Sequence, residues 1–285
     1  MTRSEVPATD SFGSVVAWGD DEFGQASVPS GPHDVTTVAA GEQHSLALHR
    51  DGHVSAWGNS TFGATSVPVG LTDVVAIAAG GQHSLALRRD GTVTAWGQND
   101  KGQSSVPTWL TDVTAVAAGG QHSLALIRYG HIAAWGWSEY DQIRVPEGLH
   151  DVTAIAAGGH QSLAVRQDGP VAAWGWNDEG PVRVPDGLHD VTAVAAGVFH
   201  CVALHRDDHI TAWGNNEAGQ SRVPSGLLDV TAITAGLGHT LALQRDGRII
   251  AWGNDEFGQA TVPGGLRPAT AVAAGDTHSL AVVVV

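Results

Sequence analysis

The sequence predicts an all-β protein, a seven-bladed β-propeller built from repeats of 39 residues. Two observations support this prediction. An Ala-Trp-Gly motif recurs at a constant spacing, and the segments between its copies alternate apolar and polar residues in the two-residue period of strands, with no helical stripe. The tryptophans of the motif are Trp18, Trp57, Trp96, Trp135, Trp174, Trp213 and Trp252.

Four strands are expected in each repeat. The first ends in Ala-Ala-Gly, and its small side chains suit a position where seven strands crowd around one axis, so we expect it to be innermost. A Ser-Leu-Ala-Leu strand and a Val-Thr-Ala-Trp strand follow, joined by a tight Arg-Asp-Gly turn such as residues 89–91. The fourth ends at Val-Pro, and since proline is tolerated only at a sheet edge, we expect it to be outermost.

The two ends of the chain predict that the ring closes. Residues 14–18 match a third strand, and residues 278–285 match a second strand that lacks its third. Pairing of these segments would complete the last blade and protect its edge. An open solenoid is the alternative, but it would require polar capping repeats, whereas residues 282–285 are all valine. We therefore expect one propeller domain over residues 14–285, preceded by an extension of residues 1–13.

Composition limits the compartment and the partners. A net charge of -15 opposes the counterion release that drives nucleic-acid binding. No apolar run is long enough to span a membrane, and residues 1–13 lack the apolar core of a secretory signal. We expect a cytoplasmic monomer that binds neither nucleic acid nor membrane, or a secreted one if a signal segment was removed. The single cysteine, Cys201, excludes an internal disulfide and a thiolate zinc cage. No cofactor or metal is expected.

Strand alternation assigns the loops to two faces. The Gly-x-x-His loops, between strands one and two, and the loops after Trp-Gly, between strands three and four, open on one side, which we call the upper face; the other loops form the lower face. The loops after Trp-Gly contain many acidic residues and one basic residue, Lys101. This charge favours a surface that steers a basic partner, although Asp and Asn are also common in ordinary solvated turns.

A histidine recurs in the upper loops. It is present at His44, His83, His122, His200, His239 and His278, with Gln161 in the remaining copy. These side chains cannot share a zinc ion, because neighbouring blades lie about 10 Å apart whereas zinc needs nitrogens at about 2.1 Å. We interpret them as structural residues that hydrogen-bond the loop backbone. The tryptophans of the Ala-Trp-Gly motif are expected to fill the space between blades.

Function is better sought where single copies depart from the repeat. Three consecutive units carry aromatic or exchanged residues in their upper loops, flanked by acidic residues. Exposed aromatic side chains with charged neighbours are typical of a protein-binding hot spot, although these rings could instead fold back onto neighbouring loops. The candidate binding residues are Trp137, Glu139, Tyr140, His160, Trp176, Asp178, Glu179 and Phe199.

The pattern Gly-x-x-His-Ser-Leu-Ala-Leu, followed by Asp-Gly, Ala-Trp-Gly and Gly-Gln, resembles the regulator of chromosome condensation (RCC1) repeat over residues 14–285. The short unit and the trailing Val-Pro are most similar to the bacterial branch typified by the streptomycete β-lactamase-inhibitory protein II. This resemblance implies a seven-bladed propeller that works by binding a protein. The eukaryotic relatives imply action on a small GTPase and contact with chromatin.

Three functions remain open from the sequence. The pattern favours a non-enzymatic protein that binds a partner, including as an inhibitor, through the aromatic and acidic residues of the upper face. The second is a lyase, hydrolase or cyclase with His160, Asp178, Glu179 or Cys201 as acid, base or nucleophile. The third is an exchange factor or scaffold of RCC1 type.

Overall fold

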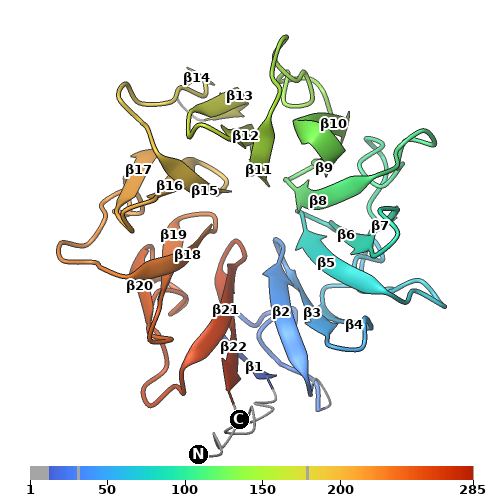
Figure 1. Ribbon diagram of the computed structural model, residues 1–285. Coiled ribbons are helices and arrows are strands. Elements are labelled where there is room, and N and C mark those ends of the chain that lie inside the picture. The colour runs from blue at the N-terminus through green and yellow to red at the C-terminus, as the bar shows by residue number, and fades with distance from the viewer. Residues whose placement is uncertain (1–12, 31–32, 178–179, 285) are drawn as a thin grey trace, which may run out of the picture.

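Seven small antiparallel sheets stand in a circle around a central channel and confirm the seven-bladed propeller (Figure 1). The computed structural model describes residues 13–30, 33–177 and 180–284. Within these ranges the only helical segment is one 3-10 turn, η1 (Arg128–Gly130). None of the described helices is long and apolar enough to cross a membrane.

The blades are numbered in the order in which the chain enters them. Blade 1 contains β2 (Val35–Ala40), β3 (His44–His49) and β4 (Val54–Gly58). Blade 2 contains β5 (Val74–Ala79), β6 (His83–Arg88) and β7 (Val93–Gly97). Blade 3 contains β8 (Val113–Ala118), β9 (His122–Ile127) and β10 (His131–Gly136). Blade 4 contains β11 (Val152–Ala157), β12 (His160–Arg166), β13 (Val171–Asn177) and β14 (Gly180–Pro181). Blade 5 contains β15 (Val191–Ala196), β16 (His200–His205) and β17 (Ile210–Gly214). Blade 6 contains β18 (Val230–Ala235), β19 (His239–Gln244) and β20 (Ile249–Gly253).

Blade 7 joins the two ends of the chain, as predicted. It consists of β21 (Ala269–Ala274), β22 (His278–Val284) and β1 (Gly13–Gly19). Strand β1 pairs with β22 over its whole length, from Gly13 opposite Val284 to Gly19 opposite His278. Residues 1–12 of the predicted extension lie outside the described residues, and Gly13 belongs to the closing strand.

The prediction of a fourth, outermost strand ending at Val-Pro is wrong. Six of the sheets have three strands, and the fourth strand of blade 4, β14, precedes its Val-Pro segment. The outer segments form tight turns instead: the amide of Ser27 donates to the carbonyl of Gly24 and that of Val28 to Ala26. Proline has no N–H to donate to a ladder, so a short segment that ends in one gains little from pairing.

Burial explains the order of strands within a blade. The middle strand is packed between neighbouring blades on both faces, so its leucines are buried. The innermost strand, with its Ala-Ala-Gly end, lines the channel in every blade, as predicted. Six of the seven motif tryptophans are buried, and Trp213 is half-buried. The apolar core is therefore a ring of layers between blades.

A hydrogen-bond network, which we call the seam network, links each blade to the next. At the seam between blades 3 and 4, His122 Nε2 lies 3.0 Å from Ser162 Oγ. That hydroxyl donates to the carbonyl of Gln142 at 2.9 Å. The same carbonyl accepts from Trp174 Nε1 at 2.9 Å. Six of the seven seams carry this arrangement, with histidines 44, 83, 122, 200, 239 and 278. The histidines are structural, but they bond a hydroxyl of the next blade rather than loop backbone.

The network fixes the protonation state of these histidines. The proton of the Ser162 hydroxyl goes to the Gln142 carbonyl, so the His122 ring must donate from Nε2 and leave Nδ1 unprotonated. His122 Nδ1 is buried without a partner. A proton there would be a desolvated charge, and burial lowers the pKa of His122 to about 3. The pKa values of the other five lie at about 3 or 4 for the same principal reason.

The seam between blades 4 and 5 lacks the network. Gln161 replaces the histidine, and its amide donates to the carbonyls of Gly197 at 3.0 Å and His200 at 3.2 Å. Cys201 replaces the hydroxyl residue. Trp213 Nε1 is buried without a partner. The residue at the place of the acceptor in the sequence is Pro181, which belongs to the added strand β14. One seam of the ring has therefore exchanged its polar links.

We predict that acid weakens the fold before the pKa of the folded histidines is reached. Between pH 6.5 and pH 4 the unfolded chain binds protons at these six positions and the folded chain does not, so stability present above pH 6.5 is lost as the pH falls. Each histidine adds a slope of about 1.4 kcal/mol per pH unit. His122→Gln should reduce this slope by one histidine, measured by urea unfolding at several pH values. The exposed His131→Gln is the control, and an unchanged slope in His122→Gln would contradict the assignment.

We also predict that restoring the missing link stabilises the ring. Gln161→His combined with Cys201→Ser should raise the free energy of unfolding by about 1 kcal/mol, the net contribution of one buried hydrogen bond. Each single variant should gain less, since its new group would lack the intended partner. A double-mutant cycle in urea measures the coupling. Strictly additive effects of the two substitutions would show that the imidazole and hydroxyl do not bond at this seam.

Candidate functional site

In five blades the loop after Trp-Gly holds its outermost residue on the upper face by the same hydrogen bond. In blade 3 the buried side chain of Gln142 accepts a hydrogen bond from the amide of Tyr140 at 2.9 Å, which fixes the tip of the loop. The same bond is made from residues 23, 101, 218 and 257. We call this place, five residues after the motif tryptophan, the tip position. The backbone of the loop is constant there, so the side chain is free to vary.

Four of the candidate residues form one aromatic cluster. Trp137 lies edge-on to Tyr140 and to His160, with ring centroids 5.1 and 4.9 Å apart. Tyr140 also lies 5.1 Å from His160 and 6.1 Å from Trp176. Edge-to-face rings at such distances attract each other, so the cluster is a preorganised surface. Trp176 remains 42% exposed.

The cluster depends on two features of blade 4: His160 and Gln161 are exchanged relative to the other repeats, and strands β12 and β13 are longer than their equivalents. Strand β12 begins at His160, one residue earlier than the equivalent strands, and β13 continues to Asn177. His160 and Trp176 therefore become directly opposed partners in the extended ladder. The exchange of His160 and Gln161 moves the imidazole from the seam to the upper face. The cluster and the altered seam have a common origin in sequence.

Of the remaining candidates that the structure describes, Phe199 and Glu139, neither has a ring contact with the cluster. Phe199 is half-buried, and no ring contact joins it to the described residues. Glu139 is exposed at the edge of the cluster. Asp178 and Glu179 lie outside the described residues. The ammonium of Lys101 lies 6.0 Å from the centroid of the Trp137 ring.

Three exposed aromatic residues of the upper face escaped the sequence analysis. Phe23, Phe62 and Phe257 occupy tip positions in blades 7, 1 and 6 and are 42%, 50% and 49% exposed. The exposed aromatic side chains thus extend beyond the three blades on which the sequence analysis concentrated. The signal was present, since Phe62 and Phe257 lie whole multiples of 39 residues from Tyr140. We call the set Phe23, Phe62, Trp137, Tyr140, Trp176 and Phe257 the aromatic rim.

The rim surrounds the upper mouth of the central channel, which has a volume of about 870 Å³. Alanine and glycine of the innermost strands form most of its wall. The ionisable residues lining it, among those the structure describes, are Glu42, His160 and Asp276. Burial, with a contribution from Glu42, raises the pKa of the Asp276 carboxyl to about 7. The channel mouth is thus acidic and flanked by aromatic rings.

The structure gives no support to Cys201 as a nucleophile. Its side chain is 1% exposed, and burial raises the pKa of its thiol far above the ordinary value. A thiolate is therefore disfavoured, and the channel does not reach this residue. In the described part of the chain no three histidine, cysteine or acidic side chains are placed to hold a metal ion.

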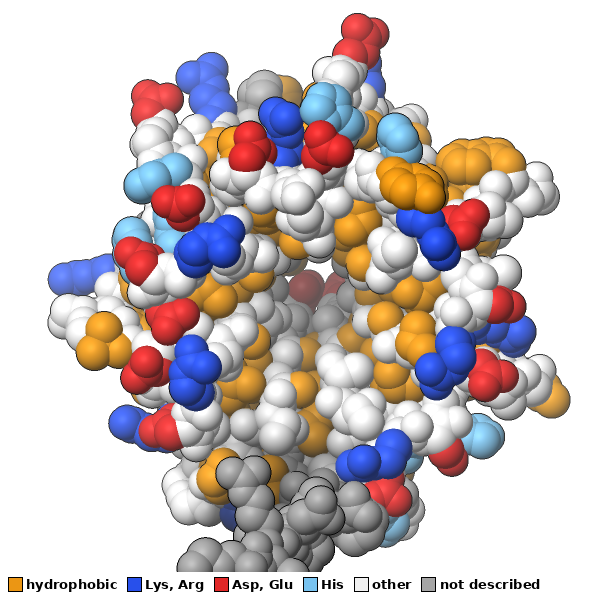
Figure 2. All heavy atoms as spheres, viewed as in Figure 1, with side chains coloured by type: hydrophobic (Ala, Val, Ile, Leu, Met, Phe, Trp, Pro, Cys, Tyr) orange, Lys and Arg blue, Asp and Glu red, His pale blue; other side chains and the backbone are white. Residues whose placement is uncertain are grey.

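The lower face carries a different kind of surface. Figure 2 shows basic and acidic side chains alternating around it, and pairs such as Arg128 with Asp112, 3.4 Å apart, contribute to this pattern. Exposed pairs of this kind add little stability. Opposite charges in close alternation produce no extended field of one sign.

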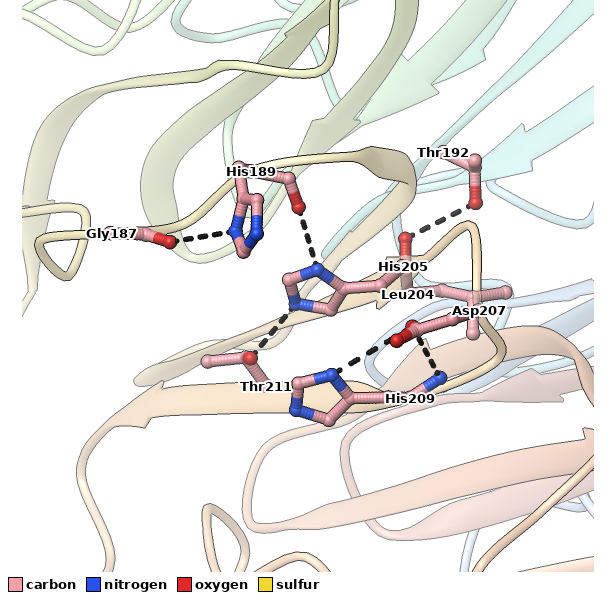
Figure 3. Close-up of polar contacts among 8 residues, drawn as sticks. All are labelled: Gly187, His189, Thr192, Leu204, His205, Asp207, His209 and Thr211. Carbon is pink, nitrogen blue, oxygen red and sulfur yellow. Dashed lines mark hydrogen bonds and ion pairs between the residues drawn. The ribbon is translucent and has the colours of Figure 1, made fainter.

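A histidine cluster in blade 5 is the other notable feature of the lower face (Figure 3). His205 and His209 are stacked, with ring centroids 4.5 Å apart. Both ring nitrogens of His205 are engaged, Nδ1 with the carbonyl of His189 at 2.7 Å and Nε2 with Thr211 Oγ1 at 2.9 Å. These bonds leave His205 no lone pair directed at a ligand. The cluster is a structural element of the turn.

Comparison with known proteins identifies the repeat. The family model described as the regulator of chromosome condensation (RCC1) repeat matches residues 35–64, 74–103, 191–220 and 230–259. No curated protein matches the sequence. Among solved structures, Prp20p from Saccharomyces cerevisiae has a TM-score of 0.82 at 19% identity, over 98% of this chain and 93% of that one.

Two further structures share the fold. Human WBSCR16 has a TM-score of 0.77 at 20% identity, covering 95% of this chain and 98% of that one. The ectodomain of the Arabidopsis thaliana receptor kinase ACR4 has a TM-score of 0.65 at 20% identity, covering 85% and 88%. The narrower resemblance to the β-lactamase-inhibitory protein II type stays a prediction. The chain contains RCC1 repeats and folds as an RCC1-like seven-bladed propeller.

Proposed function

We propose that this chain is a non-enzymatic protein-binding propeller whose upper face, the aromatic rim and the acidic side chains around it, recognises a partner protein. The observation that supports this most is the rim itself, which places aromatic rings on five blades of one face, exposed on blades 1, 4, 6 and 7 and half-buried on blade 3. Tryptophan and tyrosine dominate the energetics of protein interfaces, because a large rigid ring buries much area at small entropic cost.

Charge favours a basic partner. The tips beside the rim carry exposed Asp21, Glu22, Asp255 and Glu256, and the chain as a whole has a net charge of -15. A face with one prevailing sign of charge steers an oppositely charged protein toward it and raises the association rate. The carboxylates would then form the polar border of the interface and the rings its centre.

The ring of blades suits this role because, outside blade 4, the residues that stabilise the fold are not the ones that form the rim. The seam network and the buried leucines stabilise the propeller, whereas the tip positions contribute only the surface. The yeast protein Prp20p, which has the same fold, is described as binding Gsp1p and histones. Such partners do not carry over at 19% identity, but the example agrees with use of the fold as a protein-binding surface.

The proposal predicts that the rim can be removed without unfolding the chain. The variant Trp137→Ala, Tyr140→Ala, Trp176→Ala should lose partner capture from an extract of the source cells by about 30-fold or more, as expected for hot-spot residues worth at least about 2 kcal/mol. Quantitative mass spectrometry of the captured proteins measures the loss. Circular dichroism of the variant should retain the β spectrum, with a melting temperature lowered only by the lost ring contacts.

The matched control removes aromatic area from the opposite face. Trp109 and Tyr129 are 65% and 83% exposed in lower loops, so Trp109→Ala, Tyr129→Ala deletes comparable rings. This variant should capture the same partner as the unaltered chain. Equal losses in both variants would show that capture depends on nonspecific hydrophobic adsorption and not on the rim. Undiminished capture by the rim variant would place the binding surface elsewhere.

A further inference from the structure

Two carboxyl groups of neighbouring blades meet at the upper mouth of the channel. Glu42 follows β2 in blade 1, and Asp276 follows β21 in blade 7; both line the channel. The amide of Asp276 donates to the carbonyl of Gly41 at 3.3 Å, which holds the two loops side by side. Figure 2 looks down the channel from the lower face and shows acidic side chains at its far end.

No positive charge of the described chain offsets this pair. Neither carboxyl forms an ion pair with a described residue, and no lysine or arginine lines the channel. The side-chain contact made to the pair is a long one, from Gln82 Nε2 to Glu42 Oε2 at 3.4 Å. The carboxyl of Asp276 accepts no hydrogen bond from the described residues. Burial and the nearby Glu42 raise its pKa to about 7, because no donor or cation among the described residues stabilises the charged form. Two neighbouring carboxyl groups without a cationic partner lower the stability of the fold, and they are suited to binding a cationic group of another molecule.

Aromatic rings lie on the wall of the same cavity. Phe62 and Trp137 both line it, on blades 1 and 3. The methylene stem of a long basic side chain packs well on such rings, and a guanidinium or ammonium is attracted to their faces. The volume of about 870 Å³ leaves ample space for a side chain, because the wall is largely alanine and glycine.

We propose that the upper channel mouth is the receptor for one basic side chain, arginine or lysine, which a loop of the partner protein inserts between Glu42 and Asp276 while its flanking residues lie on the aromatic rim. This inference rests on the proposed function and adds to it the chemistry of the partner. The partner's contact loop would be basic and apolar, with the positive charge at its centre.

The test uses N-acetylarginine amide as the probe and N-acetylcitrulline amide as its uncharged counterpart. Amide signals of Gly41, Glu42 and Asp276, followed by NMR, should shift on titration with the arginine probe and saturate. The citrulline compound should bind roughly tenfold more weakly or not at all, because it lacks the charge that the carboxylates recognise. The variant Glu42→Gln, Asp276→Asn should lose binding to a similar extent.

A second acidic pair provides the control. Glu147 and Asp186 are exposed in loops of the lower face, away from the channel wall, so Glu147→Gln, Asp186→Asn removes the same charge. This variant should bind the arginine probe within about twofold of the unaltered chain, since screening weakens the contribution of distant exposed charges. Equal binding of the citrulline compound, unchanged binding by the Glu42, Asp276 variant, equal loss in the control or no saturable shift would each overturn the inference.

These outcomes separate the inference from the proposed function. If the rim variant loses partner capture but the unaltered chain binds no arginine probe, the proposed protein-binding face is supported and the proposed site for a basic side chain is rejected. If the probe binds as described but the rim variant still captures the partner, the protein-binding role of the rim fails while the cation site remains. Far-ultraviolet circular dichroism of the Glu42, Asp276 variant establishes that it is folded before binding is measured.

Discussion

The hydrogen bond between a neutral imidazole and a hydroxyl of the next blade is the constraint on which the ring depends. At each seam that carries it, one carbonyl, such as that of Gln142, accepts from both a hydroxyl and an indole N–H of the following blade. The histidine completes the chain of donors and must remain uncharged to do so. Because the groups are buried, an unpaired member would cost more than the bond contributes. The network therefore ties each blade to the next through buried groups that must all remain paired.

This constraint explains which features of the fold the sequence could predict. A period without slippage determines the number of blades, and the unmatched segments at the two ends predict the closure that Gly13 and Val284 complete. The partner of the histidine could not be read in this way, because a hydroxyl 40 residues further along becomes adjacent only when two blades pack together. The Val-Pro segments were misjudged because edge tolerance for proline does not by itself create a strand.

The candidate site was predicted in part for a similar reason. Departures from the repeat pointed to Trp137, Tyr140, His160 and Trp176, and the structure brings these four rings into contact. Phe199 departs from the repeat just as clearly and does not join them. The phenylalanines at tip positions were overlooked because they recur, and recurrence was equated with structure. A repeated position can also be a repeated surface when its backbone is fixed by a buried partner such as Gln25 or Gln259.

Blade 4 shows how recognition and folding compete for the same residues. Moving the imidazole one residue toward the N-terminus puts His160 opposite Trp176 and within the aromatic cluster, but it leaves Gln161 to face the seam. With Gln161 in place of the histidine, a serine in the neighbouring blade would have no imidazole to accept from, and that blade has Cys201 instead. The replacement at position 201 is therefore explained by the replacement at position 161. The same region adds β14 and leaves the indole N–H of Trp213 unsatisfied. A protein under selection for stability alone would have no reason to keep this seam, whereas one that needs a rigid aromatic surface at this end of the channel gains it from the exchange of two neighbouring residues.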